Sequence, residues 1–124
     1  MIGSADLVAF VPVTDLDRAR KFYEGVLGLA VESVNPFACV LRSGPVMLRV
    51  TKVDGLRPQP FTVLGWSVVD IGATALWLRE RGVESIRYDG MDQDELGVWS
   101  TPDGSKVLWF ADPDGNTLSV TQHA

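Results

Sequence analysis

The amino-acid sequence predicts an α+β fold of two tandem βαβββ modules, forming a curved, partly open, barrel-like sheet with the helices outside. Three observations predict it: the chain repeats its own pattern, each copy has one amphipathic stretch, and Pro-Asp-Gly turns separate the last strands. The 124 residues suffice for one domain with a moderate core. A content of 46% hydrophobic and 22% charged residues is typical of a globular protein.

The repeat is visible when residues 7–34 are placed beside residues 62–88. Each segment begins with strand-like alternation, reaches Asp-Leu or Asp-Ile, and continues through an amphipathic stretch to Glu-Ser-Val or Glu-Ser-Ile. Asp15 and Asp70 hold equivalent places, 55 positions apart (70 − 15). Such internal similarity decides the fold. We expect a single domain, 1–124, with module 1 over about 5–53, a linker over about 54–61 and module 2 over about 62–122.

Both predicted helices carry start and stop signals. Asp15 and Asp70 are suited to the N-cap position, because a carboxylate accepts hydrogen bonds from the free N–H groups of the first turn. Apolar residues then recur at helical spacing, and Gly28 and Gly82 supply the left-handed residue that ends a helix. Besides the opening strand of each module, strands are expected at 29–34, 37–42, 46–52, 83–88, 97–101, 106–112 and 116–122.

The acidic segment at residues 112–116, DPDGN, is open to two interpretations, a metal-binding loop or a turn. Pro113 fixes φ, Gly115 accepts a positive φ, and Asp and Asn favour turns. A calcium loop would need its glycine at the sixth position, whereas here it is the fourth. The sequence therefore favours a turn.

The two Pro-Asp-Gly turns fix the register of the last hairpins. The first places Trp99 opposite Val107, and the second places Trp109 opposite Ser119. Trp99, Trp109 and Ser119 therefore share one face, whose mixed apolar and polar character suits a ligand-binding cleft. The alternative is that the tryptophans pack a dimer interface or a sheet face.

Charge and cysteine content restrict the function classes. The net charge of −5 argues against nucleic acid and membrane as partners and favours a cationic ligand. The N-terminal residues lack the pattern of a signal peptide, so we expect a cytoplasmic protein. Cys39, the only cysteine, excludes an internal disulfide and is expected to be a buried, inert thiol.

The motifs FVPVTDLDRARKFYEGVLGL (10–29) and WFADPDGNTLSV (109–120) resemble the glyoxalase, bleomycin-resistance and ring-cleaving dioxygenase family, the vicinal oxygen chelate superfamily. The resemblance covers nearly the whole chain and implies the paired modules. It also implies where metal-using members hold their ligands: His or Gln opening each module's first strand, and Glu in the last strand of one or both modules. The matching positions here are Val8, Val63, Ser119 and Arg49.

None of these four side chains is an ordinary ligand for a divalent ion. Valine has no lone pair, a neutral serine hydroxyl is a poor ligand, and arginine brings a positive charge. The only histidine, His123, is the penultimate residue and is expected in a solvated tail. We therefore expect no metal and no other cofactor, and favour a binding protein over an enzyme.

The resemblance then implies a bleomycin-resistance type of protein, a homodimer that holds an aromatic, cationic antibiotic between aromatic side chains without metal. Arg49 would suit an anionic or carbonyl oxygen instead. It could equally form an ion pair with Glu32 or point outward. The candidate ligand-binding residues are Phe10, Phe37, Met47, Arg49, Ser67, Trp99, Trp109 and Ser119.

Other functions remain open on the sequence. A metal-dependent lyase, isomerase or dioxygenase of the same superfamily would have to use Asp94, Glu95 and His123. Metal-independent acid–base catalysis could use Tyr23, Asp92 or Glu95, although no spacing in the sequence supports it. A purely structural or regulatory module ranks behind these.

Overall fold

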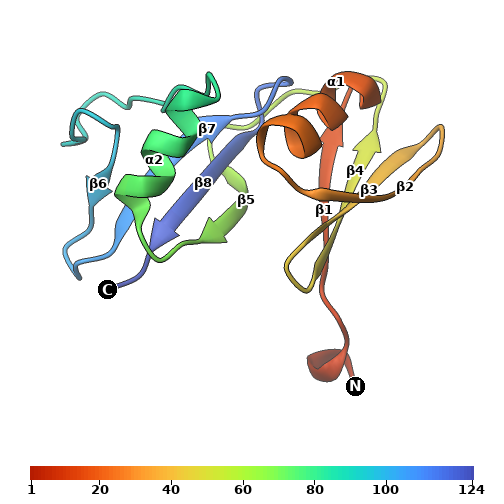
Figure 1. Ribbon diagram of the computed structural model, residues 1–124, viewed down its shortest axis with the longest axis horizontal. Helices are drawn as coiled ribbons and strands as arrows, with labels where there is room; N and C mark the ends of the chain where they lie inside the picture. The colour runs from red at the N-terminus through yellow and green to blue at the C-terminus, as the bar shows by residue number, and fades with distance from the viewer. The chain divides into compact units, whose positions relative to one another are not determined.

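The computed structural model describes all 124 residues, and the chain forms two compact units, residues 1–57 and 58–124 (Figure 1). The boundary between Arg57 and Pro58 falls inside the segment predicted as the linker. Each unit has one open four-stranded mixed sheet, and the fold is α+β as predicted. No helix is long and apolar enough to cross a membrane.

Unit 1 consists of residues 1–57. Its elements are η1 (Ile2–Ser4), β1 (Val8–Val13), α1 (Leu16–Arg20), η2 (Lys21–Val26), β2 (Ala30–Val34), β3 (Ala38–Ser43) and β4 (Val46–Lys52). The strand order is β1-β4-β3-β2, with β1 parallel to β4 and the other neighbours antiparallel. The strands of module 1 are thus confirmed.

Unit 2 repeats this topology. Its elements are β5 (Thr62–Ser67), α2 (Ile71–Glu80), β6 (Trp99–Ser100), β7 (Lys106–Ala111) and β8 (Thr117–Gln122), in the order β5-β8-β7-β6. The register repeats too: Phe10 pairs with Arg49 in unit 1, as Gly65 pairs with Ser119 in unit 2. The repeat in the sequence is therefore a repeat of strand order and register.

The helix signals act as predicted. The side chains of Asp15 and Asp70 each accept a hydrogen bond of 3.0 Å from the backbone N–H three residues on. Gly28 and Gly82 have φ angles of 80° and 79°, in the region that favours glycine. The π-helical segment η2 was not predicted. It is marked by the bond from the Leu27 N–H to the Phe22 carbonyl, five residues back.

Both sheets bury the face that the helix covers. In unit 1 Val11 and Val13 are fully buried there, and Cys39 is buried too, which raises the pKa of its thiol. In unit 2 Trp66 stacks on the buried ring of Phe110, with centroids 6.3 Å apart. The opposite faces are left to carry the candidate ligand-binding residues.

The strand predicted at residues 83–88 is absent, and the one predicted at 97–101 contracts to the two residues of β6. A glutamine side chain takes the place of a neighbouring strand. The Gln93 Oε1 accepts from the Tyr88 N–H at 2.8 Å, and its Nε2 donates to the carbonyls of Ile86 and Gly97 at 2.9 Å each. These three backbone groups are therefore satisfied by a side chain and not by a neighbouring strand.

We expect the change Gln93→Ala to speed deuterium exchange of the Tyr88 amide by about tenfold, since it removes the acceptor of that N–H. Exchange measured by NMR checks this. Asp92→Ala is the control, because Asp92 is the exposed neighbour and should leave Tyr88 protected. Unchanged Tyr88 protection in the Gln93 variant would contradict the assigned role.

Candidate functional site

The sheet face of unit 2 that points away from α2 carries four of the candidate residues, Ser67, Trp99, Trp109 and Ser119. The predicted register is confirmed, because Trp99 pairs with Val107 and Trp109 pairs with Ser119. The two turns set the strand register, and the alternation of side chains along each strand then puts these residues on one face.

Trp109 is the centre of an aromatic cluster on this face. Its ring centroid lies 6.1 Å from that of Trp99, with the planes tilted by 33°, and 5.3 Å from that of Tyr88, edge to face. All three side chains are half-buried, so each still exposes ring surface. Sequence reasoning missed Tyr88 as a site residue. The structure places Tyr88 there, because the hydrogen bond from the Ile86 N–H to the Trp109 carbonyl (2.7 Å) holds residues 86–88 along β7.

Ser119 supplies a polar group beside the aromatic cluster, which we define as Tyr88, Trp99 and Trp109. Its side chain is 7% exposed and lies over Gly65 on β5. A Cβ at position 65 would stand 3.1 Å from the Ser119 Oγ, so glycine leaves the hydroxyl its space. Ser67 follows two residues later on the same face and is exposed.

In unit 1 the face away from α1 carries Phe10, Met47 and Arg49. Phe10 and Arg49 are paired neighbours on β1 and β4, and Met47 pairs with Val8. The Phe10 ring is 61% exposed, which is unusual for so large an apolar side chain. Phe37 does not lie on a strand of this face, because it precedes β3. Its side chain is 75% exposed, and its carbonyl accepts a hydrogen bond from the Lys52 N–H at 2.8 Å.

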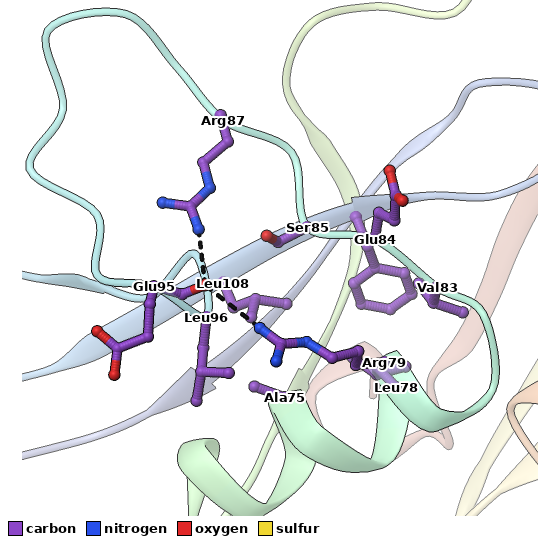
Figure 2. A pocket seen from close by; sticks show the side chains of 11 residues that line it. Ala75, Leu78, Arg79, Val83, Glu84, Ser85, Arg87, Glu95, Leu96 and Leu108 are labelled. Carbon is purple, nitrogen blue, oxygen red and sulfur yellow. Dashed lines mark hydrogen bonds between the residues drawn. The ribbon is translucent and has the colours of Figure 1, made fainter.

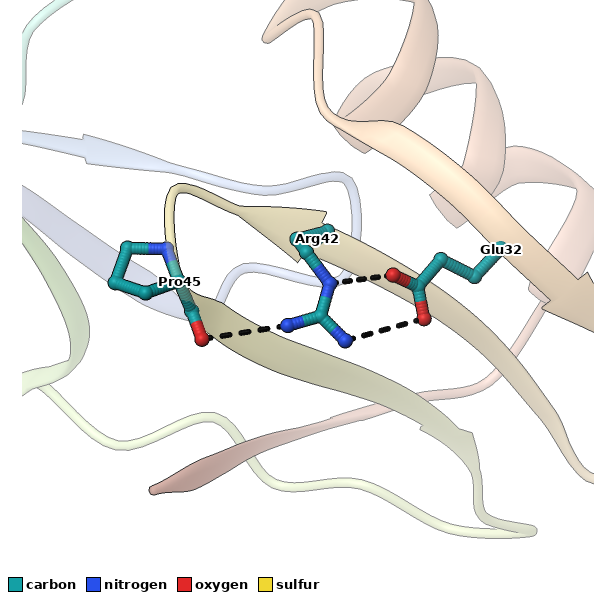
Figure 3. A network of polar contacts seen from close by, with 3 residues as sticks. All are labelled: Glu32, Arg42 and Pro45. Atoms are coloured by element: carbon teal, nitrogen blue, oxygen red, sulfur yellow. Dashed lines mark hydrogen bonds and ion pairs between the residues drawn. The ribbon is translucent and has the colours of Figure 1, made fainter. Parts of the chain in front are cut away.

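The suggested ion pair between Arg49 and Glu32 is not formed, because Arg42 binds Glu32 (Figure 3). The Arg42 Nε and Nη2 donate to the two carboxylate oxygens, and Nη1 donates to the Pro45 carbonyl at 3.3 Å. A bulge between Val31 and Ser33 shifts the register at Glu32. The hydrogen bonds from Arg42 hold the pKa of Glu32 below its ordinary value.

The segment 112–116 is a turn, as predicted. The Asp112 Oδ1 accepts from the backbone N–H groups of Asp114 (3.0 Å) and Asn116 (2.9 Å), and its Oδ2 accepts from the Asn116 Nδ2 (2.8 Å). Gly115 has a φ of 90°. The Asp112 carboxylate is thus committed to the turn, which holds β7 and β8 in the register that pairs Trp109 with Ser119.

Asp112→Ala is expected to lower the free energy of unfolding by about 1–3 kcal/mol, because it leaves buried donors without their acceptor. Urea unfolding measures the change, and Asp89→Ala, at an exposed loop position, is the control, expected within about 0.5 kcal/mol of the parent. Millimolar calcium chloride should leave the parent's unfolding midpoint unchanged. A calcium-dependent rise that Asp112→Ala abolishes would instead indicate a metal loop.

A separate cavity of about 410 Å³ lies on the other side of the unit 2 sheet, between α2, β7 and the segment 83–96 (Figure 2). Its lining includes Leu78, Arg79 and Phe110, and none of the candidate ligand-binding residues. Glu95, which the sequence offered only for metal or acid–base chemistry, also lines it. Four separate stretches of chain contribute to it, so no local sequence pattern indicated it. The cavity and the aromatic cluster are two distinct features on opposite faces of one sheet.

Two units with the same strand order, each with a helix after its first strand, define a glyoxalase-fold protein. The chain belongs to the Glyoxalase/Bleomycin resistance protein/Dioxygenase superfamily, whose family model matches residues 5–120. No curated protein matches the chain significantly.

Solved structures share this fold with the chain at low sequence identity. A glyoxalase family protein from Bacillus anthracis has a TM-score of 0.76 at 16% identity, covering 98% of this chain and 96% of its own. TnmS3, an antibiotic binding protein from Streptomyces sp. CB03234, has a TM-score of 0.73 at 24% identity, covering 98% and 97%. A superfamily member from Sphaerobacter thermophilus has a TM-score of 0.74 at 22% identity, covering 99% and 100%. These similarities show the fold.

The metal of the superfamily's enzymes does not fit the residues present here. The positions that the resemblance matches to the family's metal ligands are Val8 and Arg49 in unit 1, and Val63 and Ser119 in unit 2. Two aliphatic side chains, a guanidinium and a hydroxyl offer a divalent cation no imidazole or carboxylate. The structure also has no group of three His, Cys, Asp or Glu side chains placed to hold a metal ion.

Proposed function

We propose that this protein is a metal-free small-molecule-binding protein that sequesters an aromatic antibiotic or a similar natural product. The observation that carries the proposal is the aromatic cluster of unit 2, in which Trp109 contacts both Trp99 and Tyr88 beside the Ser119 hydroxyl. Flat apolar rings next to a few polar groups are the usual composition of a ligand-binding surface.

The strength of such a surface comes from desolvation. Burying a large apolar side chain is worth about 1.5–3 kcal/mol, and a well-oriented aromatic pair adds about 0.5–1.5 kcal/mol. Because the cluster offers three half-buried rings, a planar aromatic ligand can gain several such contributions. Ser119 and Ser67 supply hydrogen-bonding groups that can orient it.

The net negative charge of the protein favours a ligand of positive charge. A net charge of −5 attracts a cationic, partly aromatic molecule. The exposed Phe10, with Met47 and Phe37, offers further apolar surface in unit 1, where Arg49 would bind a carbonyl or anionic oxygen of the ligand. We further propose that the protein acts in the cytoplasm as a homodimer. TnmS3, a protein of the same fold, is an antibiotic binding protein, and this similarity supports antibiotic binding among the chemistries that the fold can carry.

Titration of tryptophan fluorescence with daunorubicin and with metal-free bleomycin tests the proposal, after the protein has been treated with a chelator. We expect saturable quenching that chelation leaves unchanged. If the purified protein holds stoichiometric zinc, nickel, iron or manganese, and chelation removes both the metal and a catalytic turnover, the protein is an enzyme and the proposal is wrong. Sedimentation velocity at the same concentrations tests the homodimer through the doubled mass.

A further inference from the structure

The cavity on the α2 side of unit 2 combines an apolar floor with two guanidinium groups (Figure 2). The floor is formed by side chains of α2 and β7 that are at most 5% exposed: Ala75, Leu78, Leu108 and Phe110. The guanidinium groups belong to Arg79, near the end of α2, and Arg87, on the segment that follows it.

Both arginines bond the same carbonyl oxygen. The Arg79 Nη2 donates to the Glu95 carbonyl at 3.3 Å, and the Arg87 Nη2 donates to it at 2.9 Å. Arg87 Nη1 also donates to the carbonyls of Asp94 (2.6 Å) and Gln93 (3.4 Å). Since one acceptor is shared, two positive charges are held side by side, and their partners are neutral backbone groups that cannot cancel them.

The two acidic side chains that line the cavity are not paired with these guanidinium groups. Figure 2 shows the carboxylates of Glu84 and Glu95 turned away from the guanidinium groups, and neither forms an ion pair with Arg79 or Arg87. Ser85 adds a hydroxyl to the lining. It fits because Gly97, with a φ of 89°, has no Cβ; one placed there would stand 2.2 Å from the Ser85 Oγ.

From this arrangement we propose that the cavity is a second ligand site, which binds a small organic oxyanion, a carboxylate on an apolar body. The carboxylate accepts hydrogen bonds from Arg79 and Arg87, whose guanidinium groups match the geometry of an oxyanion. The apolar body occupies the floor between α2 and β7. A volume of about 410 Å³ lies within the range of about 300–1,000 Å³ that small-molecule pockets have.

This site is independent of the proposed antibiotic-binding face. The aromatic cluster lies on the opposite face of the same sheet, and the two sites share no residue. They also select opposite charges: the aromatic face is proposed for cationic ligands, and the cavity for anions. Either proposal can therefore fail without the other.

Isothermal titration and two-dimensional NMR with octanoate test the site. We expect octanoate to bind and to shift the amide signals of Ser85 and Leu96, which line the cavity. Octanamide, which has the same body without the charge, should bind at least about fivefold more weakly, the loss expected for an ion pair with partly exposed arginines. Equal affinity for the two would overturn the proposal, and so would the absence of binding at millimolar octanoate.

Arg79→Gln and Arg81→Gln form a matched pair. Both remove one positive charge at the end of α2, but Arg81 stacks on Trp77 at 3.8 Å and does not line the cavity. Arg79→Gln should weaken octanoate binding about fivefold, while Arg81→Gln leaves it within about twofold. Equal losses in both variants would show that octanoate responds only to the general charge of the protein, and would overturn the site.

Two further variants distinguish the cavity from the aromatic face as the binding site of octanoate. Ala75→Leu adds side-chain volume to the cavity floor and should abolish octanoate binding while all guanidinium groups stay in place. Trp109→Ala, on the opposite face, should leave octanoate affinity unchanged. If Trp109→Ala weakens octanoate binding and Ala75→Leu does not, octanoate binds the aromatic face and the cavity is not its site.

Discussion

Trp109→Ala is expected to weaken the binding of daunorubicin and of metal-free bleomycin by about tenfold or more, which corresponds to about 1.4 kcal/mol or more. Trp109 is the ring that both other members of the aromatic cluster contact, so its removal takes away the central contact surface and the support of Tyr88 and Trp99. Isothermal titration measures the affinity, since the variant also loses a fluorescent reporter.

Trp77→Ala is the matched control for this change. Trp77 is also half-buried, but it lies on α2 under the Arg81 guanidinium and not on the aromatic face. It should leave ligand affinity within about twofold of the parent. If both tryptophan variants bind as the parent does, Trp109 belongs to an interface or a sheet surface, and the proposed site is wrong.

Phe110→Ala is expected to lower the free energy of unfolding by about 3–5 kcal/mol, the largest effect on stability that we predict for a single change. The Phe110 side chain is 1% exposed, stacks on Trp66, and lies on β7 between β6 and β8. Its removal enlarges the cavity between the sheet and α2 and strips Trp66 of its stacking partner, and the neighbours relax only in part. Urea unfolding followed by circular dichroism measures the loss.

Phe61→Ala is the corresponding control, because Phe61 precedes β5 and is 59% exposed. The same loss of atoms there should change the free energy of unfolding by less than about 1 kcal/mol. Equal effects of the two phenylalanine changes would contradict the burial that the fold assigns to Phe110.

Much of the fold could be predicted because its signals are local. Asp15 and Asp70 cap helices through bonds to residues three positions on, and Gly115 adopts the positive φ that its turn requires. Turn position then sets the strand register, and alternation sets the face, so Trp109 could be placed opposite Ser119 from the sequence. These inferences need no knowledge of distant contacts.

The features that could not be predicted depend on such distant contacts. Residues 83–88 have a strand-like pattern, but the side chain of Gln93 bonds the Tyr88 N–H and the Ile86 carbonyl in place of a strand. Glu32, at the bulge in β2, pairs with Arg42, whereas the sequence had offered it as one possible partner of Arg49. The arginine pair of the cavity meets only because both side chains reach the carbonyl of Glu95. A hydrogen bond from a side chain to a distant backbone group produces no periodic pattern in the sequence, so sequence analysis does not detect it.

The brevity of β6 has a consequence for solubility at high concentration. An outer strand of two residues offers very little exposed backbone to which a strand of another molecule could attach, and Gln93 already occupies backbone groups of the adjoining segment. The β6 edge of the unit 2 sheet is therefore protected against edge-to-edge association with the sheet of another molecule. The short strand and the Gln93 side chain both contribute, and an aliphatic residue at position 93 would remove the second contribution.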